Sequence, residues 1–215
     1  MNKFYYKYDE LEKIMSVLVG RQAPDFTASA VLSSGKIVDD FNLAGTIKGK
    51  KAVIFFYPLN FTFVCPSELI AFHNRMEDFK NRGVEVIGVS IDSAFSHNAW
   101  RETPVAKGGI GAVSYTLVAD VKQTIVKDYD VAHPAAGVAL RGSFLIDEEG
   151  IVRHQVINDL PLGRNIDEML RMIDALAFHQ KHGEVCPAGW QEGKKGMVAD
   201  TEGVAAYLAE NAEQL

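Results

Sequence analysis

Cys65 stands between an apolar segment, 52–57 (AVIFFY), and a segment of helical periodicity that begins at Pro66. Proline lacks a backbone N–H and fixes φ at about −65°, so it suits the first position of a helix. The pattern predicts that Cys65 lies at a helix N-terminus, where free amides and the helix dipole stabilise a negative charge. The predicted chemistry is that of a reactive thiolate.

The helix end alone is too weak to keep this thiol ionised. Making the thiolate predominate down to about pH 6 takes roughly 3.4 kcal/mol relative to a free cysteine. A helix terminus supplies about 0.3 to 1 kcal/mol, or about 2 when partly buried. Glu68, one turn on, would oppose the thiolate if it were ionised and faced the sulfur. A cation from elsewhere is therefore required, and we expect Glu68 to orient it.

Three residues are candidates to support Cys65. Arg141 heads the apolar segment 141–147 (RGSFLID), and its fork of N–H donors suits a thiolate and an oxygen leaving group. Thr62 can donate its hydroxyl to the sulfur or to a substrate, and Pro58 would exclude water and fix the loop. Each also has an ordinary interpretation: a core cysteine, a surface charge, a turn residue and a strand end. The residues alone leave both interpretations open.

Composition excludes several classes of function. The chain has 215 residues, a net charge of −6 and two cysteines, which disfavours nucleic-acid and membrane partners and a disulfide-stapled scaffold. The N-terminal residues do not resemble a secretory signal, and no 18-residue apolar run occurs, so we expect a cytoplasmic protein. The six histidines include no H-x-x-x-H pair, so neither zinc nor haem is expected.

Apolar strands alternate with helical segments, which is the α/β pattern. Strands are predicted at 52–57, 84–90, 116–119, 142–147 and 151–157, the last two joined by a turn with Gly150. Helices are predicted at 66–80, 121–129 after Asp120, 166–179 after an Asn165 cap with Glu168 three residues on, and 201–210. We expect a central mixed sheet flanked by helices. Residues 1–14 form a peripheral extension, 15–180 the domain, and 181–215 an arm that packs on the domain or a partner.

The segment FFYPLNFTFVCPSEL resembles the active-site motif of the peroxiredoxins, Pro-x-x-x-Thr/Ser-x-x-Cys, at Pro58, Thr62 and Cys65. The likeness extends over residues 17–208 and includes the segments HNAW (97–100), GGIG (108–111), RGSFLID (141–147), LPLGR (160–164) and EVCPAGW (184–190). It is close to the typical two-cysteine class, which includes the alkyl hydroperoxide reductase C proteins. The resemblance implies a thioredoxin-like fold for the domain.

The resemblance also implies roles for individual residues. Cys65 would be the peroxidatic cysteine, with Pro58, Thr62 and Arg141 as its supporting residues. Glu68 and Arg164 would hold the catalytic arginine in a salt-linked network, and Trp100 would be a structural part near the dimer and the active-site loops. Cys186 would be the resolving cysteine, which in this class attacks from the other subunit of a dimer.

The implied reaction needs no cofactor. The thiolate attacks a peroxide and becomes a sulfenic acid, water or an alcohol leaves, and Cys186 then forms a disulfide with Cys65. Thioredoxin or a flavoprotein disulfide reductase would reduce this disulfide, and the long arm favours thioredoxin. The family assembles as homodimers, and a decamer of five dimers is the expected assembly.

Two other functions were compared with this one. A thioredoxin-like disulfide oxidoreductase would need a Cys-x-x-Cys pair, but position 68 is Glu. A binding or holdase protein would depend on its ring-shaped assembly rather than on its cysteines. Substituting Cys65 distinguishes the two functions, because a peroxidase would lose its activity and a holdase would not.

The C-terminal arm generates one prediction. In the family, a GGLG-type turn and a C-terminal Tyr-Phe pair slow the unwinding at the peroxidatic cysteine and favour its over-oxidation. This chain has GGIG at 108–111 but Tyr207-Leu208 in place of Tyr-Phe, so we expect intermediate sensitivity. Mass spectrometry across a peroxide titration should show sulfinic Cys65 at high peroxide. Its complete absence under turnover would contradict the expectation.

Overall fold

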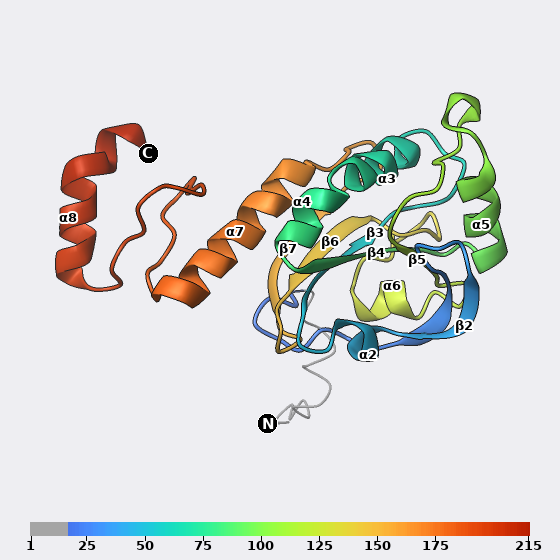
Figure 1. Ribbon diagram of the computed structural model, residues 1–215, viewed down its shortest axis with the longest axis horizontal. Helices are drawn as coiled ribbons and strands as arrows, with labels where there is room; N and C mark the ends of the chain where they lie inside the picture. Colours follow the sequence, from blue (N-terminus) through green and yellow to red (C-terminus); the bar gives the residue numbers. More distant parts are fainter. Residues whose placement is uncertain (1–16) are drawn as a thin grey trace, which may run out of the picture.

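The computed structural model describes residues 17–215, so the extension expected at 1–14 lies outside the described part. Its centre is a seven-stranded sheet of order β2-β1-β5-β4-β3-β6-β7 (Figure 1). The strands are β1 (Thr27–Val31), β2 (Ile37–Asn42), β3 (Lys51–Phe56), β4 (Val84–Ser90), β5 (Thr116–Ala119), β6 (Arg141–Ile146) and β7 (Val152–Asn158). The β3–β4 and β4–β5 pairs are parallel and the other pairs are antiparallel, which confirms a mixed sheet.

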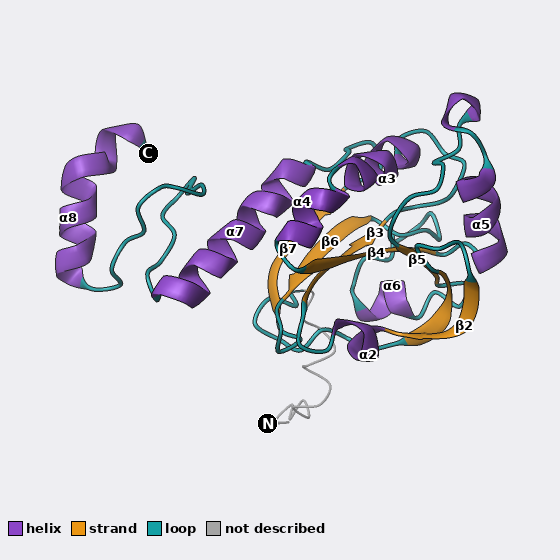
Figure 2. Ribbon diagram, viewed as in Figure 1, coloured by secondary structure: helices purple, strands orange, loops and turns teal. Residues whose placement is uncertain are grey.

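Helices cover both faces of the sheet, as Figure 2 shows. The apolar run of β3 contributes to a hydrophobic core layer on each face of the sheet, because Val53 and Phe55 face one side and Ile54 and Phe56 the other. One layer contains α3 (Cys65–Asn74), α4 (Met76–Asn81), α5 (Ala94–Glu102) and α7 (Ile166–His182). The other contains α2 (Leu43–Ile47) and α6 (Ile125–Asp128).

The single helix predicted over 66–80 is wrong, because the chain forms α3 and α4 with a break at Arg75. The Arg75 N–H bonds to the Phe72 carbonyl, an i→i−3 bond that tightens the last turn of α3. After the break, Phe72 and Phe79 still lie in contact, with ring centroids 5.9 Å apart. The Arg75 side chain forms an ion pair with Asp167 of α7.

The helix predicted over 121–129 is also wrong in its start, since α6 begins only at Ile125. Gln123 has φ +55°, a left-handed conformation that does not fit a right-handed helix. Asp120 still acts as expected of a capping residue, because its carboxylate accepts from the Thr124 and Val126 amides. The β6–β7 hairpin is confirmed, with Gly150 at φ +83°.

Helix α7 begins as predicted, with Asn165 Oδ1 accepting from the amides of Asp167 and Glu168. It runs on to His182, beyond the predicted end, and stops at Gly183 in the left-handed region. The predicted C-terminal helix is α8 (Thr201–Asn211), followed by the short helix η3 (Ala212–Gln214). Figure 1 shows α8 beyond the far end of α7, away from the sheet.

The sequence patterns did not predict several elements, namely β1, β2, α2, α5 and the short helix η2 (Val105–Lys107). Strand β2 buries only Phe41 fully, and α2 has only one turn, so neither has a long apolar signal. Helix α5 is capped by Ser93, whose side chain accepts from the Ser96 amide. Within residues 17–215, no helix is both long enough and apolar enough to cross a membrane.

Candidate active site

Cys65 is the first residue of α3, and its side chain is fully buried. Pro66 follows at the start of the helix, as predicted, and the amides of Ser67 and Glu68 bond to the Val64 carbonyl. The Arg141 guanidinium donates from Nη1 to the Cys65 sulfur over 3.4 Å. The expected cation therefore lies beside the sulfur, carried there by the first residue of β6.

Glu68 holds two arginines beside the cysteine. One carboxylate oxygen accepts from Arg141 at 2.5 Å, and Arg164 donates to both oxygens from Nε and Nη2 at 2.9 and 3.0 Å. The three side chains are at most 4% exposed. With Glu68 ionised, this ion cluster of Glu68, Arg141 and Arg164 has one positive charge in excess. A thiolate at Cys65 brings the buried group to neutrality, which is the arrangement that burial favours.

The two arginines are also anchored to the backbone. Arg164 Nη1 donates to the carbonyls of Phe56 and Gly142 at 2.6 and 2.8 Å, and Arg141 Nε donates to the Leu160 carbonyl at 2.7 Å. Burial lowers the pKa of Arg164 from its usual value, while the Glu68 carboxylate opposes this effect. These bonds fix the ion cluster to the ends of β3 and β6.

The loop between β3 and α3 carries the other two predicted supports. Pro58 is buried directly after the strand, and Thr62 is half-buried. The Thr62 hydroxyl donates to the Leu59 carbonyl at 2.8 Å. Its proton therefore goes to the loop and not to the Cys65 sulfur, which was one of the two partners expected from the sequence.

Trp100 connects the 108–111 turn to this loop. Its indole N–H donates to the Gly108 carbonyl at 2.9 Å, and its ring lies 5.7 Å from the Phe61 ring. The turn itself needs glycine, because a Cβ on Gly109 would overlap the Thr103 carbonyl. Trp100 thus joins the 108–111 turn to the loop that precedes Cys65.

A buried polar network that the sequence did not reveal fixes the same loop. The Tyr57 hydroxyl donates to Asn60 Oδ1 at 2.9 Å, and Asn60 Nδ2 donates to Ser96 Oγ at 2.9 Å. His97 Nε2 donates to the Val118 carbonyl, which leaves Nδ1 as an acceptor 3.1 Å from Asn60 Nδ2. Burial raises the pKa of Tyr57 well above its usual value, so its hydroxyl remains a donor.

The C-terminal half of α3 is tied to the segment before β5. The Tyr115 hydroxyl donates to the Leu69 carbonyl at 2.7 Å, and the Ser114 amide donates to His73 Nδ1 at 3.2 Å. These bonds start one turn after Cys65. The first turn of α3 is held instead by the two arginines, through Cys65 and Glu68.

Cys186 lies apart from Cys65 in the described chain. It is half-buried in the segment that follows α7, where its thiol donates to the Ala175 carbonyl of that helix at 3.4 Å, and both cysteines are free. Burial raises the pKa of Cys186, and the nearby Arg171 opposes this effect. Among residues 17–215, no three His, Cys, Asp or Glu side chains gather in a metal-ligating cluster.

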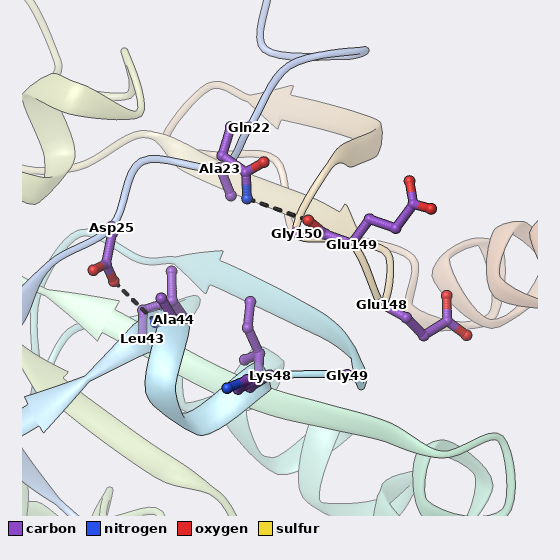
Figure 3. A pocket seen from close by; sticks show the side chains of 11 residues that line it. Gln22, Ala23, Asp25, Leu43, Ala44, Lys48, Gly49, Glu148, Glu149 and Gly150 are labelled. Carbon is purple, nitrogen blue, oxygen red and sulfur yellow. Dashed lines mark hydrogen bonds between the residues drawn. The ribbon is translucent and has the colours of Figure 1, made fainter.

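Two cavities flank the sheet without containing either cysteine. One, of about 250 Å³, lies beside the site and includes Arg164 and His154 in its lining. The other, of about 170 Å³, lies at the β6–β7 turn, the end of β6 opposite Arg141. Figure 3 shows the latter between Gln22, Asp25, Lys48 and Glu149. The chemistry of the molecule is therefore placed at Cys65 by its ion cluster rather than by a large cavity.

A cysteine at a helix start beside an arginine has the surroundings that are typical of thiol-based redox enzymes. The family model "AhpC/TSA family" matches residues 19–155, and "C-terminal domain of 1-Cys peroxiredoxin" matches residues 175–210. The chain therefore belongs to the AhpC/TSA family, as a peroxiredoxin, a class of thiol-dependent peroxidases. The fold is accordingly thioredoxin-like.

Individual relatives agree with this assignment. Alkyl hydroperoxide reductase C of Helicobacter pylori (strain ATCC 700392 / 26695) is 56% identical, over 93% of this chain and 100% of its own length. Peroxiredoxin-1 of Gallus gallus is 49% identical, over 89% and 95%. The structure of reduced Plasmodium vivax 2-Cys peroxiredoxin is similar with a TM-score of 0.86 at 47% identity, over 90% of this chain and 99% of that one.

The buried His97 generates a prediction for stability against pH. Burial lowers the pKa of His97 from 6.5 to about 4, so the unfolded chain binds the proton more readily between these values. Stability is therefore complete above about pH 6.5 and falls as the pH falls, by about 2 kcal/mol from this residue between pH 7 and 5. Urea unfolding at the two pH values measures the loss.

His97→Gln is the matched variant for this test. It should be less stable at pH 7, because it loses bonds of the Tyr57–Asn60–His97 network. Its stability should nevertheless fall less on acidification than that of the wild type. Equal losses in the two proteins would show that His97 is not the responsible group.

Proposed function

We propose that the protein reduces hydrogen peroxide and organic hydroperoxides with the Cys65 thiolate as the nucleophile. The observation that carries this proposal is the bond from Arg141 to the buried sulfur, inside an ion cluster with one excess positive charge. A hydrogen bond to a charged group contributes about 1.5 to 3 kcal/mol. The helix end contributes about 0.3 to 2 kcal/mol in the same direction.

The first step is a displacement at oxygen. The Cys65 sulfur attacks one peroxide oxygen, an S–O bond forms as the O–O bond breaks, and the second oxygen takes a proton and leaves as water or an alcohol. Arg141 donates to the sulfur and is within reach of the developing charge on the leaving oxygen. Pro58 keeps water from the sulfur, and Thr62 positions the peroxide from the same loop.

The second step joins Cys65 to Cys186 of the other subunit. The Cys186 thiol attacks the sulfenic sulfur, an S–S bond forms, and the hydroxyl leaves as water. Pairing across subunits is supported by the positions within one chain, since Cys65 is enclosed beside Arg141 while Cys186 lies against α7. The first turn of α3 has to unwind for the sulfurs to meet.

An external dithiol then reduces the disulfide by exchange. The donor that we propose is thioredoxin, with a flavoprotein disulfide reductase as the alternative. A cytoplasmic location is proposed with it, because both cysteines are free and the cycle depends on a reducing environment.

Exposed apolar residues support assembly into a ring of dimers. Phe63 is 98% exposed and Phe95 is 76% exposed, on the active-site loop and on α5, respectively. Strand β7 is the edge of the sheet and exposes Val156 and Ile157, which suits pairing with a second copy. A related Plasmodium yoelii protein modified at its N-terminus is described as an artifactual octamer. We propose a homodimer that assembles to a decamer.

Two cysteine variants test the reaction. Cys65→Ser should lose steady-state peroxide consumption entirely, because the nucleophile is removed. Cys186→Ser should complete one turnover and stop at the sulfenic acid. A non-reducing gel after peroxide should show a covalent dimer in the wild type alone. Retained steady-state activity in Cys65→Ser would refute the proposal.

A second prediction concerns the assembly. Burying a phenylalanine contributes about 1.5 to 3 kcal/mol, so Phe63→Asp should weaken the contact between dimers about tenfold or more. Sedimentation velocity should then show dimers at concentrations where the wild type forms larger rings. Val121→Asp, which changes a 62% exposed residue outside these surfaces, is the control. Equal sedimentation of all three proteins would count against the decamer contact.

A further inference from the structure

The segment after α7 forms an ordered loop that lies back along the helix. After Gly183, the backbones of Val185 and Met197 exchange two hydrogen bonds of 2.9 Å, which close the loop 184–197. Trp190 is only 4% exposed, and its ring lies 4.8 Å from that of Phe178 on α7. The closed loop therefore holds Cys186 in a fixed position against α7.

Arg171 holds this loop on the helix. Its Nη1 donates to the Trp190 carbonyl at 2.7 Å, while Nε and Nη2 bond to the Glu168 carboxylate, both at 2.7 Å. Arg171 precedes Ala175 by four residues, so the two lie on the same face of α7. That face also carries Cys186, whose thiol donates to the Ala175 carbonyl.

The charge of Arg171 acts on Cys186 directly. Burial has the larger effect and raises the pKa of Cys186, and Arg171 lowers it. The interaction is mutual, since Cys186 contributes to the raised pKa of Arg171, after the larger effect of Glu168. Other charged or titratable groups near Arg171 and Cys186 come from four elements: Glu168, Asp174 and His179 on α7, Glu184 and Glu192 on the loop, His154 on β7, and Arg82 after α4. Asp174 is paired with Arg82, and His179 Nδ1 donates to the Glu184 carbonyl.

We propose that Arg171 is the positioning residue of the resolving half-reaction. It clamps the loop to α7 through the Trp190 carbonyl and keeps a positive charge beside the Cys186 sulfur as that sulfur becomes a nucleophile. In this step the Cys186 proton and the sulfenic hydroxyl leave together as water while the S–S bond forms. The inference deepens the proposed function and rests on it for the reaction step. The effect of Arg171 on the ionisation of Cys186 does not depend on that function.

The thiol can be tested without any peroxidase activity. In a Cys65→Ser background, Cys186 is the only thiol of the chain, so its alkylation by iodoacetamide against pH reports its ionisation. Adding Arg171→Gln should move the midpoint up by about one pH unit. Arg171→Lys keeps the charge and should stay within about half a unit of the background. Arg75→Gln, which removes another arginine paired to α7, should leave the midpoint in place.

The second measurement follows disulfide formation by stopped flow in proteins that retain both cysteines. Arg171→Gln should form the disulfide about fivefold more slowly at pH 7, and the difference from the wild type should narrow as the pH rises. An unchanged alkylation midpoint, a slowing that is equal at every pH, or a shift shared by Arg171→Lys would each overturn the proposal. If the wild type itself forms no disulfide, the proposed function fails, whereas the alkylation result still decides the role of Arg171.

Discussion

The buried ion cluster of Glu68, Arg141 and Arg164 is the interaction on which the rest of the structure depends. Buried charges are costly unless they are paired and hydrogen-bonded, so the ends of β3 and β6 and the start of α3 have to meet at one point. The backbone carbonyls of Phe56 and Gly142 that accept from Arg164 belong to β3 and β6, which makes the sheet part of the site. The excess positive charge then determines which atom completes the site, the Cys65 sulfur.

Much of the central fold follows from local patterns. Strand β3 is predictable because its apolar run is buried on both faces, and α7 because it begins with Asn165 and carries an apolar stripe. The break at Arg75 and the late start of α6 are not predictable in this way. They depend on one tightened turn and on one left-handed residue, Gln123, and hydrophobic periodicity is insensitive to both.

The candidate site also has a part that the sequence predicts and a part that it does not. The need for a cation beside Cys65 follows from energetics alone, and Arg141 is predictable because it heads a buried strand. The Tyr57–Asn60–His97 network is not, because it joins a loop to the distant helix α5 and none of its members stands in a distinctive local pattern. The partner of the Thr62 hydroxyl was likewise undetermined, since a loop carbonyl is available to it. Pairings of this kind become visible only when the chain is folded.

The division of the helical segment at Arg75 confines motion at the active site. The bonds from Tyr115 and Ser114 hold α3 from Leu69 onward, and α4 has its own contacts with β4. Opening at Cys65 therefore has to break the bonds from Arg141 and Arg164 to the first turn, while the later turns of α3 and α4 stay in place. This local opening then governs how long the oxidised sulfur stays enclosed. The enzyme's sensitivity to its surroundings is a local property, set by a few residues of α3 rather than by the stability of the whole fold.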